Sequence, residues 1–306
     1  MSHGADSTKS ILFALVANFL IAIAKFIAAY ITKSGSMLAE AIHSVVDTSN
    51  QVLLLIGLNR SKMPPSDEHP LGHGKTIYFW SFIVALILFS LGGVYAIYEG
   101  LHKIQNPQPI NSPLIAIGVL VFAIIAESVS LWGCIREINK VRVNRSFTKW
   151  FRESRQSELL VVFGEDIAAI SGLVFALIAI IMTMVTGDPV YDAIGTLVIG
   201  ILLVIIAIFL GREVKDLLIG QGVEPHIRKD MLETLNSNSK IENVFNFLSL
   251  QMGNDVMVAI KAKMTESDSS TNSATKMIDD INECETEFKQ KYPQVKWLFF
   301  EPDNKD

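Results

Sequence analysis

Six long apolar stretches constrain the fold of this chain more than any other feature of its sequence. They cover about residues 10–31, 37–59, 77–101, 114–135, 158–186 and 190–211. A helix needs roughly 20 mostly apolar residues to cross the ~30 Å hydrocarbon core of a bilayer, and each stretch is long enough to do so. The sequence therefore predicts an all-α transmembrane domain of six spans over residues 1–211, in contact with membrane lipid.

Charge divides the chain where the last apolar stretch ends. Residues 1–211 carry 14 Lys and Arg against 14 Asp and Glu, whereas residues 212–306 carry 12 against 17, so the formal net charge of −5 lies entirely in the second part. This distribution excludes a disordered chain and a basic nucleic-acid-binding protein, so no nucleic-acid partner is expected. Cys134 and Cys284 lie in unlike segments, which argues against a structural disulfide.

Basic residues are concentrated in alternate loops. Loop 136–157 holds seven Lys or Arg and loop 60–76 holds three, whereas the opposite side has only Lys33 and Lys103. Because short cytoplasmic loops are enriched in Lys and Arg, we expect a multi-pass membrane protein with both termini in the cytoplasm. No signal or targeting peptide is evident, which favours a bacterial inner membrane.

Residues 212–306 are long enough for one small cytoplasmic domain. We expect a helix over 226–236, strands over 243–252 and 256–264 with a hairpin turn at 253–255, a polar loop over 267–273, a helix over 272–291 and a strand over 295–300. The order αββαβ predicts an α+β domain with its helices on one face of the sheet.

His43 and Asp47 are ionisable residues inside the second span and need a physical reason. Each such side chain costs at least ~2.5–3.5 kcal/mol near the bilayer centre. They are four residues apart, so both point from one helix face. An imidazole and a carboxylate at this spacing can bind one divalent cation. The alternative is a His–Asp hydrogen bond that stabilises helix packing.

Glu165 and Asp166 are adjacent carboxylates in the fifth span. Neighbouring residues lie about 100° apart around a helix, so both flank one ion only if Gly164 permits a local distortion. We expect Asp166 to be a metal ligand. Glu165 is expected either to be a ligand or to orient the site and carry protons.

Lys25, Glu99 and Glu127 are further ionisable residues within the spans. Lys25 is expected to pair with Glu127 or to extend toward the membrane surface. For all three we expect structural pairing rather than direct metal contact, and for Lys25 and Glu127 a proton relay is the other role considered.

The loop 64–75 places two carboxylates and two histidines within seven residues, namely Asp67, Glu68, His69 and His73. Such a set can hold a second divalent ion or attract ions toward the membrane. A solvated polar loop is the alternative.

Taken together, these features resemble the cation diffusion facilitator family. The resemblance rests on the six spans, His43-Ser-Val-Val-Asp47, the span-five carboxylate, the His69-Pro-Leu-Gly-His73-Gly loop and the αββαβ tail. It covers nearly the whole chain and is closest to the zinc-transporter branch that has a mitochondrial animal member. It implies a homodimeric secondary transporter, not an enzyme, that exports Zn²⁺ or a related divalent metal in exchange for protons. It also implies that the tail is metallochaperone-like and helps dimerisation.

The resemblance assigns the transport site to His43, Asp47 and Asp166. The family's first span-five ligand, typically a histidine, falls on Val162 in this chain. A zinc site would then have three protein ligands, with water or Glu165 as the fourth. Because a carboxylate-rich site suits Mn²⁺ or Fe²⁺ better than a histidine-rich one, a Mn²⁺ or Fe²⁺ exporter is the alternative to a Zn²⁺ exporter.

The resemblance also extends to the loop and the tail. The family's second metal site corresponds to Asp67, His69 and His73. In the tail, three residues are weak candidates for metal contact, namely His226, Glu301 and Asp303. A dimerisation domain with a solvated acidic face is preferred there.

Two rival functions are an intramembrane metalloenzyme and a membrane metal sensor. No HExxH motif occurs in the sequence, which argues against a hydrolase. A sensor predicts metal binding without flux, so a flux measurement separates it from a transporter.

Overall fold

A computed structural model describes residues 3–142, 145–265 and 273–305, with only the backbone described for residues 3–14, 16, 17 and 273. The chain divides into two compact units. The first comprises Met1–Gly57, Phe79–Phe147 and Ser157–Val214, and the second comprises Leu58–Tyr78, Thr148–Gln156 and Lys215–Asp306. The first unit is helical, and the second contains the sheet.

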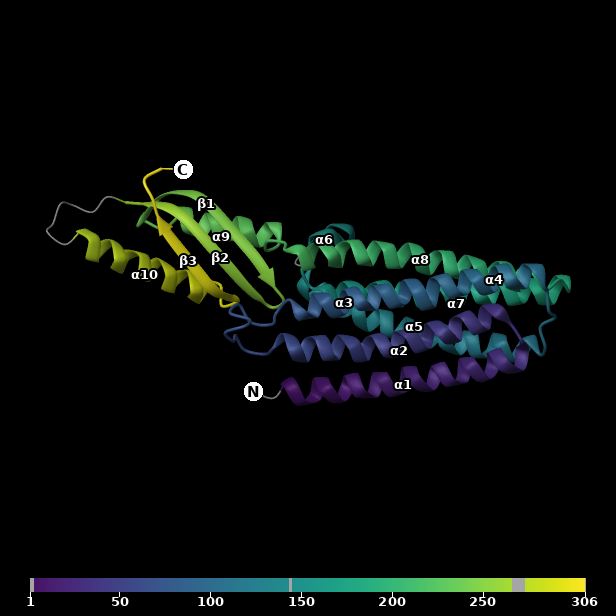
Figure 1. Cartoon of the computed structure of the whole chain (residues 1–306). Helices are drawn as coiled ribbons and strands as arrows, with labels where there is room; N and C mark the ends of the chain where they lie inside the picture. Colours follow the sequence, from purple (N-terminus) through teal and green to yellow (C-terminus); the bar gives the residue numbers. More distant parts are fainter. Residues whose placement is uncertain (1–2, 143–144, 266–272, 306) are drawn as a thin grey trace. The chain divides into compact units, whose positions relative to one another are not determined.

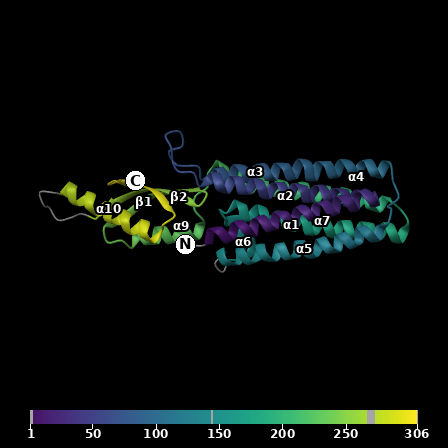
Figure 2. The ribbon, with the colours of Figure 1, turned by 90° about the horizontal axis from the view of Figure 1, so that it is seen from below.

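The first unit is a bundle of long helices that run side by side (Figures 1 and 2). The helices are α1 (His3–Thr32), α2 (Gly35–Ser61), α3 (Thr76–Ile87) continued by the π-helical turn η1 (Leu88–Val94) and α4 (Tyr95–Gln105), α5 (Pro113–Val141), α7 (Ser157–Thr186) and α8 (Val190–Ile219). Within the part of the chain that the structure describes, five of these stretches are long and apolar enough to span a membrane, and α1 has a shorter apolar part over Asn18–Thr32. The predicted helical membrane domain is confirmed.

Large apolar side chains cover the outside of this bundle. Tyr30 is 77% exposed, and Leu114 and Val185 are each 73% exposed. Exposed apolar patches of this kind are rare on soluble monomers, whereas a lipid environment requires them.

Glycines bring α8 close to α4. A Cβ atom added at Gly100 would lie 2.7 Å from the backbone nitrogen of Leu197, and one added at Gly200 would lie 2.6 Å from the backbone nitrogen of Ile97. In lipid, where no hydrophobic force drives helices together, such close backbone packing is a main source of association. Substitution of either glycine would push the two helices apart.

The C-terminal part of the second unit has the predicted αββαβ order: α9 (Pro225–Asn236), β1 (Ile241–Met252), β2 (Asp255–Met264), α10 (Ser273–Lys291) and β3 (Val295–Pro302). Most of the short helix α6 (Phe147–Glu153), which lies earlier in the sequence, also belongs to this unit. β1 and β2 are antiparallel and β3 is parallel to β2, which gives the order β1-β2-β3. Gly253 adopts φ +68° in the turn of the predicted hairpin. Of the predicted polar loop 267–273, all but Ser273 lies outside the described residues.

Both helices of this α+β unit cover one face of the sheet, as predicted (Figure 1). Met231 of α9 and Phe288 of α10 pack with Val258 and Ile260 of β2 in one core. The hydroxyl of Tyr292, just after α10, donates a 2.5 Å hydrogen bond to Asp230 of α9. The core and this bond hold the two helices together.

Candidate functional site

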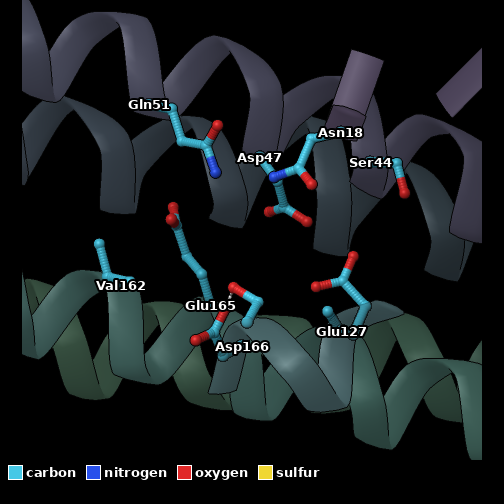
Figure 3. A pocket seen from close by; sticks show the side chains of 10 residues that line it. Asn18, Ser44, Asp47, Gln51, Glu127, Val162, Glu165 and Asp166 are labelled. Carbon is cyan, nitrogen blue, oxygen red and sulfur yellow. Dashed lines mark hydrogen bonds between the residues drawn. The ribbon is translucent and has the colours of Figure 1, made fainter. Parts of the chain in front are cut away.

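A cavity of about 40 Å³ lies inside the helical unit (Figure 3). Helices α1, α2, α5 and α7 supply its lining, which consists of Asn18, Ser44, Asp47, Gln51, Glu127, Ser130, Val162, Glu165, Asp166 and Ala169. Four of these residues are carboxylates. Because a water molecule needs about 10–15 Å³ of such volume, the cavity has room for an ion together with water.

Asp47 reaches the cavity from α2, one helical turn after His43. The Nδ1 atom of His43 lies 3.5 Å from Oδ1 of Asp47, as the four-residue spacing predicts. This separation is too long for a good hydrogen bond. Neither ring nitrogen of His43, nor Oδ1 of Asp47, has a hydrogen-bond partner in the described part of the chain. Buried polar atoms without partners cost free energy, and a cation bound there would remove that cost for the oxygen.

His43 itself is fully buried, at 0% exposure, and is not among the residues that line the cavity. The imidazole therefore lies next to Asp47 but not at the cavity surface. In this conformation the cavity presents mainly oxygen atoms to an ion.

Glu165 and Asp166 of α7 both line the cavity. The amide of Asn50 donates a 2.5 Å hydrogen bond to Oε1 of Glu165, and the Ser130 hydroxyl donates a 3.1 Å hydrogen bond to Oδ1 of Asp166. The second oxygen of Asp166, Oδ2, is buried and has no partner among the residues described. Asp166 is therefore oriented through one oxygen, while its other oxygen is left without a partner at the wall of the cavity.

The expected distortion at Gly164 is not needed, because α7 is helical throughout Ser157–Thr186. A Cβ at Gly164 would lie 2.8 Å from Cδ2 of Leu210 on α8. Gly164 therefore provides space for Leu210 rather than flexibility for the two carboxylates.

Glu127 of α5 faces Asp47 across the cavity (Figure 3). Its position adds a fourth helix-borne carboxylate to the lining. The side chains surround the space without converging: within the described ranges, no group of three or more His, Cys, Asp or Glu is placed to hold a metal ion. Mutual repulsion of carboxylates favours such a spread arrangement.

Lys25 of α1 forms its ion pair with Glu40 of α2, which corrects the expected pair with Glu127. Its Nζ atom lies 3.4 Å from Oε2 of Glu40 and 2.6 Å from Oγ of Ser44. Lys25 and Glu40 are both 0% exposed. Sequence reasoning did not single out Glu40, although a carboxylate three residues before His43 in an apolar span carries the same membrane cost.

Asp192, at the start of α8, holds the N-terminal end of α2. Its carboxylate accepts hydrogen bonds from Oγ of Ser34 at 2.6 Å, the backbone nitrogen of Gly35 at 2.6 Å and the backbone nitrogen of Ser36 at 3.2 Å. Asp192 is 3% exposed. An anion here satisfies free N–H groups and interacts favourably with the helix dipole. The helix that carries His43 and Asp47 is thereby fixed at one end.

The loop histidines lie together in the second unit. The rings of His69 and His73 have centroids 4.3 Å apart. The loop packs on the hairpin turn of the same unit, because a Cβ at Gly74 would collide with the carbonyl oxygen of Met252. Asp67 and Glu68 are exposed in this loop, and the structure does not gather them with the histidines into a three-residue ligand group within the described ranges.

The tail candidates are likewise dispersed over the part of the chain that is described. Nδ1 of His226 lies 3.4 Å from Oε2 of Glu224. Oδ2 of Asp303 lies 3.0 Å from Nζ of Lys261, and this hydrogen bond lowers the pKa of the Asp303 carboxyl. Glu301 is exposed near the end of β3. Asp303, just after β3, is therefore used in an ion pair with Lys261 of β2.

Comparison with known proteins identifies the family to which this chain belongs. Residues 11–219 match the family model described as the cation efflux transmembrane domain. The proton-coupled zinc antiporter SLC30A9, mitochondrial, of Mus musculus is 32% identical over 247 residues, which is 80% of this chain and 44% of that protein. Metal tolerance protein C4 of Arabidopsis thaliana is 30% identical over 249 residues, covering 81% of this chain and 54% of its own length.

A more distant relative has a similar length. The cation-efflux pump FieF of Citrobacter koseri is 20% identical over 268 residues, covering 87% of this chain and 83% of the pump. The chain spans about half the length, or less, of the mitochondrial antiporter and the plant protein. Because the family model matches well over half of the chain, the chain belongs to the cation efflux, or cation diffusion facilitator, family, whose members are transporters and not enzymes.

Proposed function

We propose that this protein exports a divalent metal cation, with Zn²⁺ as the first candidate, from the cytosol in exchange for protons. The observation that carries the proposal is the cavity inside the helical unit, lined by carboxylates from α2, α5 and α7. Oδ1 of Asp47 and Oδ2 of Asp166 are buried without partners among the described residues, so the site favours a cation. The names of the SLC30A9 relatives support both zinc and protons as transported species.

The proposed transport site consists of His43, Asp47 and Asp166, with Glu165 as a fourth group. The cavity alternates between access from the cytoplasm and access from the opposite side. Because metal ligands must be deprotonated, a metal ion and protons compete for the same atoms. Metal loading therefore releases protons to the cytoplasm, and protons entering from the acidic side displace the metal.

The proposed arrangement places both termini in the cytoplasm, because loop 136–157 and loop 60–76 hold most of the basic residues of the membrane domain. Residues 1–211 would carry transport, and residues 212–306 would form a cytoplasmic domain that joins two copies of the chain. The loop residues Asp67, His69 and His73 would bind a second ion. That ion would draw the Asp67 carboxylate toward the two histidine rings.

Export of Mn²⁺ or Fe²⁺ is a second candidate that one observation favours. Val162 is apolar and lines the cavity, whereas His43 does not belong to the lining. The cavity thus presents carboxylate, amide and hydroxyl oxygens, which suit Mn²⁺ better than nitrogen-preferring metals.

Transport by the purified full chain in liposomes tests the proposal. With an acidic lumen and a neutral exterior, each of Zn²⁺, Mn²⁺, Fe²⁺, Co²⁺ and Cd²⁺ is supplied outside in turn. Metal should accumulate in the lumen, alkalinise it, and stop accumulating when a protonophore removes the gradient. Binding without flux would instead identify a sensor, and flux that ignores the gradient would exclude antiport. The order of rates decides between zinc and manganese or iron.

A further inference from the structure

Lys25 and Glu40 form a charge pair inside the membrane domain that the proposed transport cycle does not use. Nζ of Lys25 lies 3.4 Å from Oε2 of Glu40, and both residues are 0% exposed. Removing two charges from water is expensive, and replacement of a buried pair by apolar residues is often neutral or stabilising. Stability alone therefore gives little reason for placing this pair in the span next to His43.

The pair is connected to the transport cavity through one side chain. Nζ of Lys25 donates a 2.6 Å hydrogen bond to Oγ of Ser44, and Ser44 lines the cavity. Neither Lys25 nor Glu40 is part of the lining. The ammonium group therefore lies one side chain behind the cavity wall.

The carboxylate of Glu40 contacts the ammonium group and fits against α7. A Cβ added at Gly172 of α7 would collide with Oε1 of Glu40, so this glycine leaves space for the carboxylate. The same oxygen is buried and has no hydrogen-bond partner in the ranges that the structure describes. The Glu40 carboxylate thus makes its described side-chain contacts through Oε2 to Lys25 alone.

Charges act strongly over short distances in such an interior, because little water screens them. A positive charge behind the wall lowers the affinity of the cavity for a divalent cation. A negative charge behind it partly offsets that effect. The two residues therefore change the affinity in opposite directions without touching the ion.

We propose that Lys25 and Glu40 are positioning residues that set the affinity of the transport cavity, with Lys25 weakening metal binding so that the ion can be released and Glu40 limiting that weakening. The inference rests on the proposed function and adds to it the residues that determine how tightly the cavity binds metal. It predicts opposite changes of metal affinity in the two single variants, which a merely structural pair does not produce.

The test measures metal binding by the full chain in nanodiscs at one fixed pH, with Zn²⁺ and then Mn²⁺ as probes. Lys25→Met should tighten binding by about tenfold, as expected for a unit charge close to a divalent ion in a poorly screened site. Glu40→Gln should weaken binding by only about threefold, because Glu40 contacts Lys25 and not the cavity wall. Lys25→Arg keeps the charge and should stay within about twofold of wild type. Lys103→Met is the matched control, because Lys103 pairs with Asp192 at 3.9 Å and does not line this cavity.

Transport kinetics give a second readout. Lys25→Met should lower both KM and the maximal rate, because a tightly held ion leaves slowly. If a lone buried charge prevents the single variants from folding, the double variant Lys25→Met/Glu40→Met tests the inference. It should fold and bind the metal about threefold more tightly than wild type, because Lys25 is the charge that is hydrogen-bonded to the cavity wall.

Shifts of both single variants in the same direction, or a double variant with wild-type affinity, overturn the inference. Wild-type protein that neither binds nor transports any of the metals would instead overturn the proposed function, so the two failures are distinguishable.

Discussion

The amide of Asn50 on α2 donates a 2.5 Å hydrogen bond to Glu165 on α7, and both residues are buried. The bond joins the two helices that carry Asp47 and Asp166. We expect Asn50→Ala to lower the free energy of unfolding by about 1–3 kcal/mol, because it leaves a buried carboxylate without its donor. KM for the metal should rise several-fold in proteoliposomes, because Glu165 loses its orientation.

Ser81→Ala is the matched control for this variant. Ser81 and Ser157 form a buried 3.1 Å hydrogen bond that also ends on α7, and neither residue lines the cavity. It should cost similar stability and leave KM unchanged. An equal rise of KM in both variants would mean that helix packing, and not the orientation of Glu165, limits binding.

Asp47→Ala should abolish metal flux while the free energy of unfolding changes by less than about 1 kcal/mol. The side chain lines the cavity and is 14% exposed, so its loss relieves repulsion among carboxylates rather than emptying a packed core. Flux is measured in proteoliposomes and stability by thermal unfolding. Glu137→Gln, which removes an exposed carboxylate of α5 at 56% exposure, should transport normally. Wild-type flux in Asp47→Ala would remove α2 from the mechanism.

Val162→His should shift selectivity toward Zn²⁺. Val162 lines the cavity, and an imidazole there adds the nitrogen ligand that the present lining lacks. We expect the ratio of Zn²⁺ to Mn²⁺ transport to rise about tenfold, which corresponds to about 1.4 kcal/mol of preference for nitrogen ligation. Val162→Ala, which opens the same space without a ligand, should leave the ratio near that of wild type. A similar ratio in both variants contradicts the placement of the ion near Val162.

Asp192→Ala should destabilise the membrane domain by about 2–5 kcal/mol, because four buried donors at and just before the start of α2 lose their acceptor. Glu137→Ala is the control, because Glu137 is an exposed carboxylate of α5 that forms a surface ion pair with Lys140. Unfolding in detergent, followed by circular dichroism, measures both. Equal stability of the two variants would show that α2 does not depend on this cap.

The tail should show a pH-dependent contribution from Asp230. The hydrogen bond from Tyr292, and to a lesser extent that from Lys291, lowers the pKa of the Asp230 carboxyl. A lowered folded-state pKa stabilises the fold above the ordinary carboxyl pKa of about 4, and the effect disappears as pH falls through the lowered value. Hydrogen exchange of the full chain should therefore be faster in α9 of Asp230→Asn than of wild type at pH 7.

The same difference should vanish in strong acid, where wild-type Asp230 is itself protonated. Asp279→Asn, which alters an exposed carboxylate of α10, should match wild type at both pH values. A difference that persists unchanged at low pH would point to the geometry of the amide rather than to the charge.

The architecture was largely predictable because it depends on local patterns. Apolar length predicted the spans, and alternation around Gly253 predicted the hairpin whose turn the structure places there. Both signals are contained in contiguous residues. The partner of Lys25 was not predictable in this way, because it depends on how α1 is rotated against α2, and several carboxylates in the spans were equally plausible.

Part of the cavity lining was predictable, because Asp47, Glu165 and Asp166 were candidates from the sequence, but the depth of each side chain was not. Spacing places His43 and Asp47 on one helix face, which the 3.5 Å separation agrees with, but it does not say which of the two reaches the cavity. Glu127 and Asn18 enter the lining from helices whose sequences show no ligand motif. A distortion at Gly164 was the condition for both carboxylates to flank one ion, whereas in the structure this glycine admits Leu210, a contact that no local pattern reveals.

The glycine contacts between α4 and α8 restrict which residues these two positions accept. A Cβ at Gly100 would meet the backbone of Leu197, and one at Gly200 would meet the backbone of Ile97. Because backbone atoms cannot rotate away as a flexible side chain can, even alanine at either position requires the two helices to separate. A chain that keeps this helix pair therefore needs glycine at both positions.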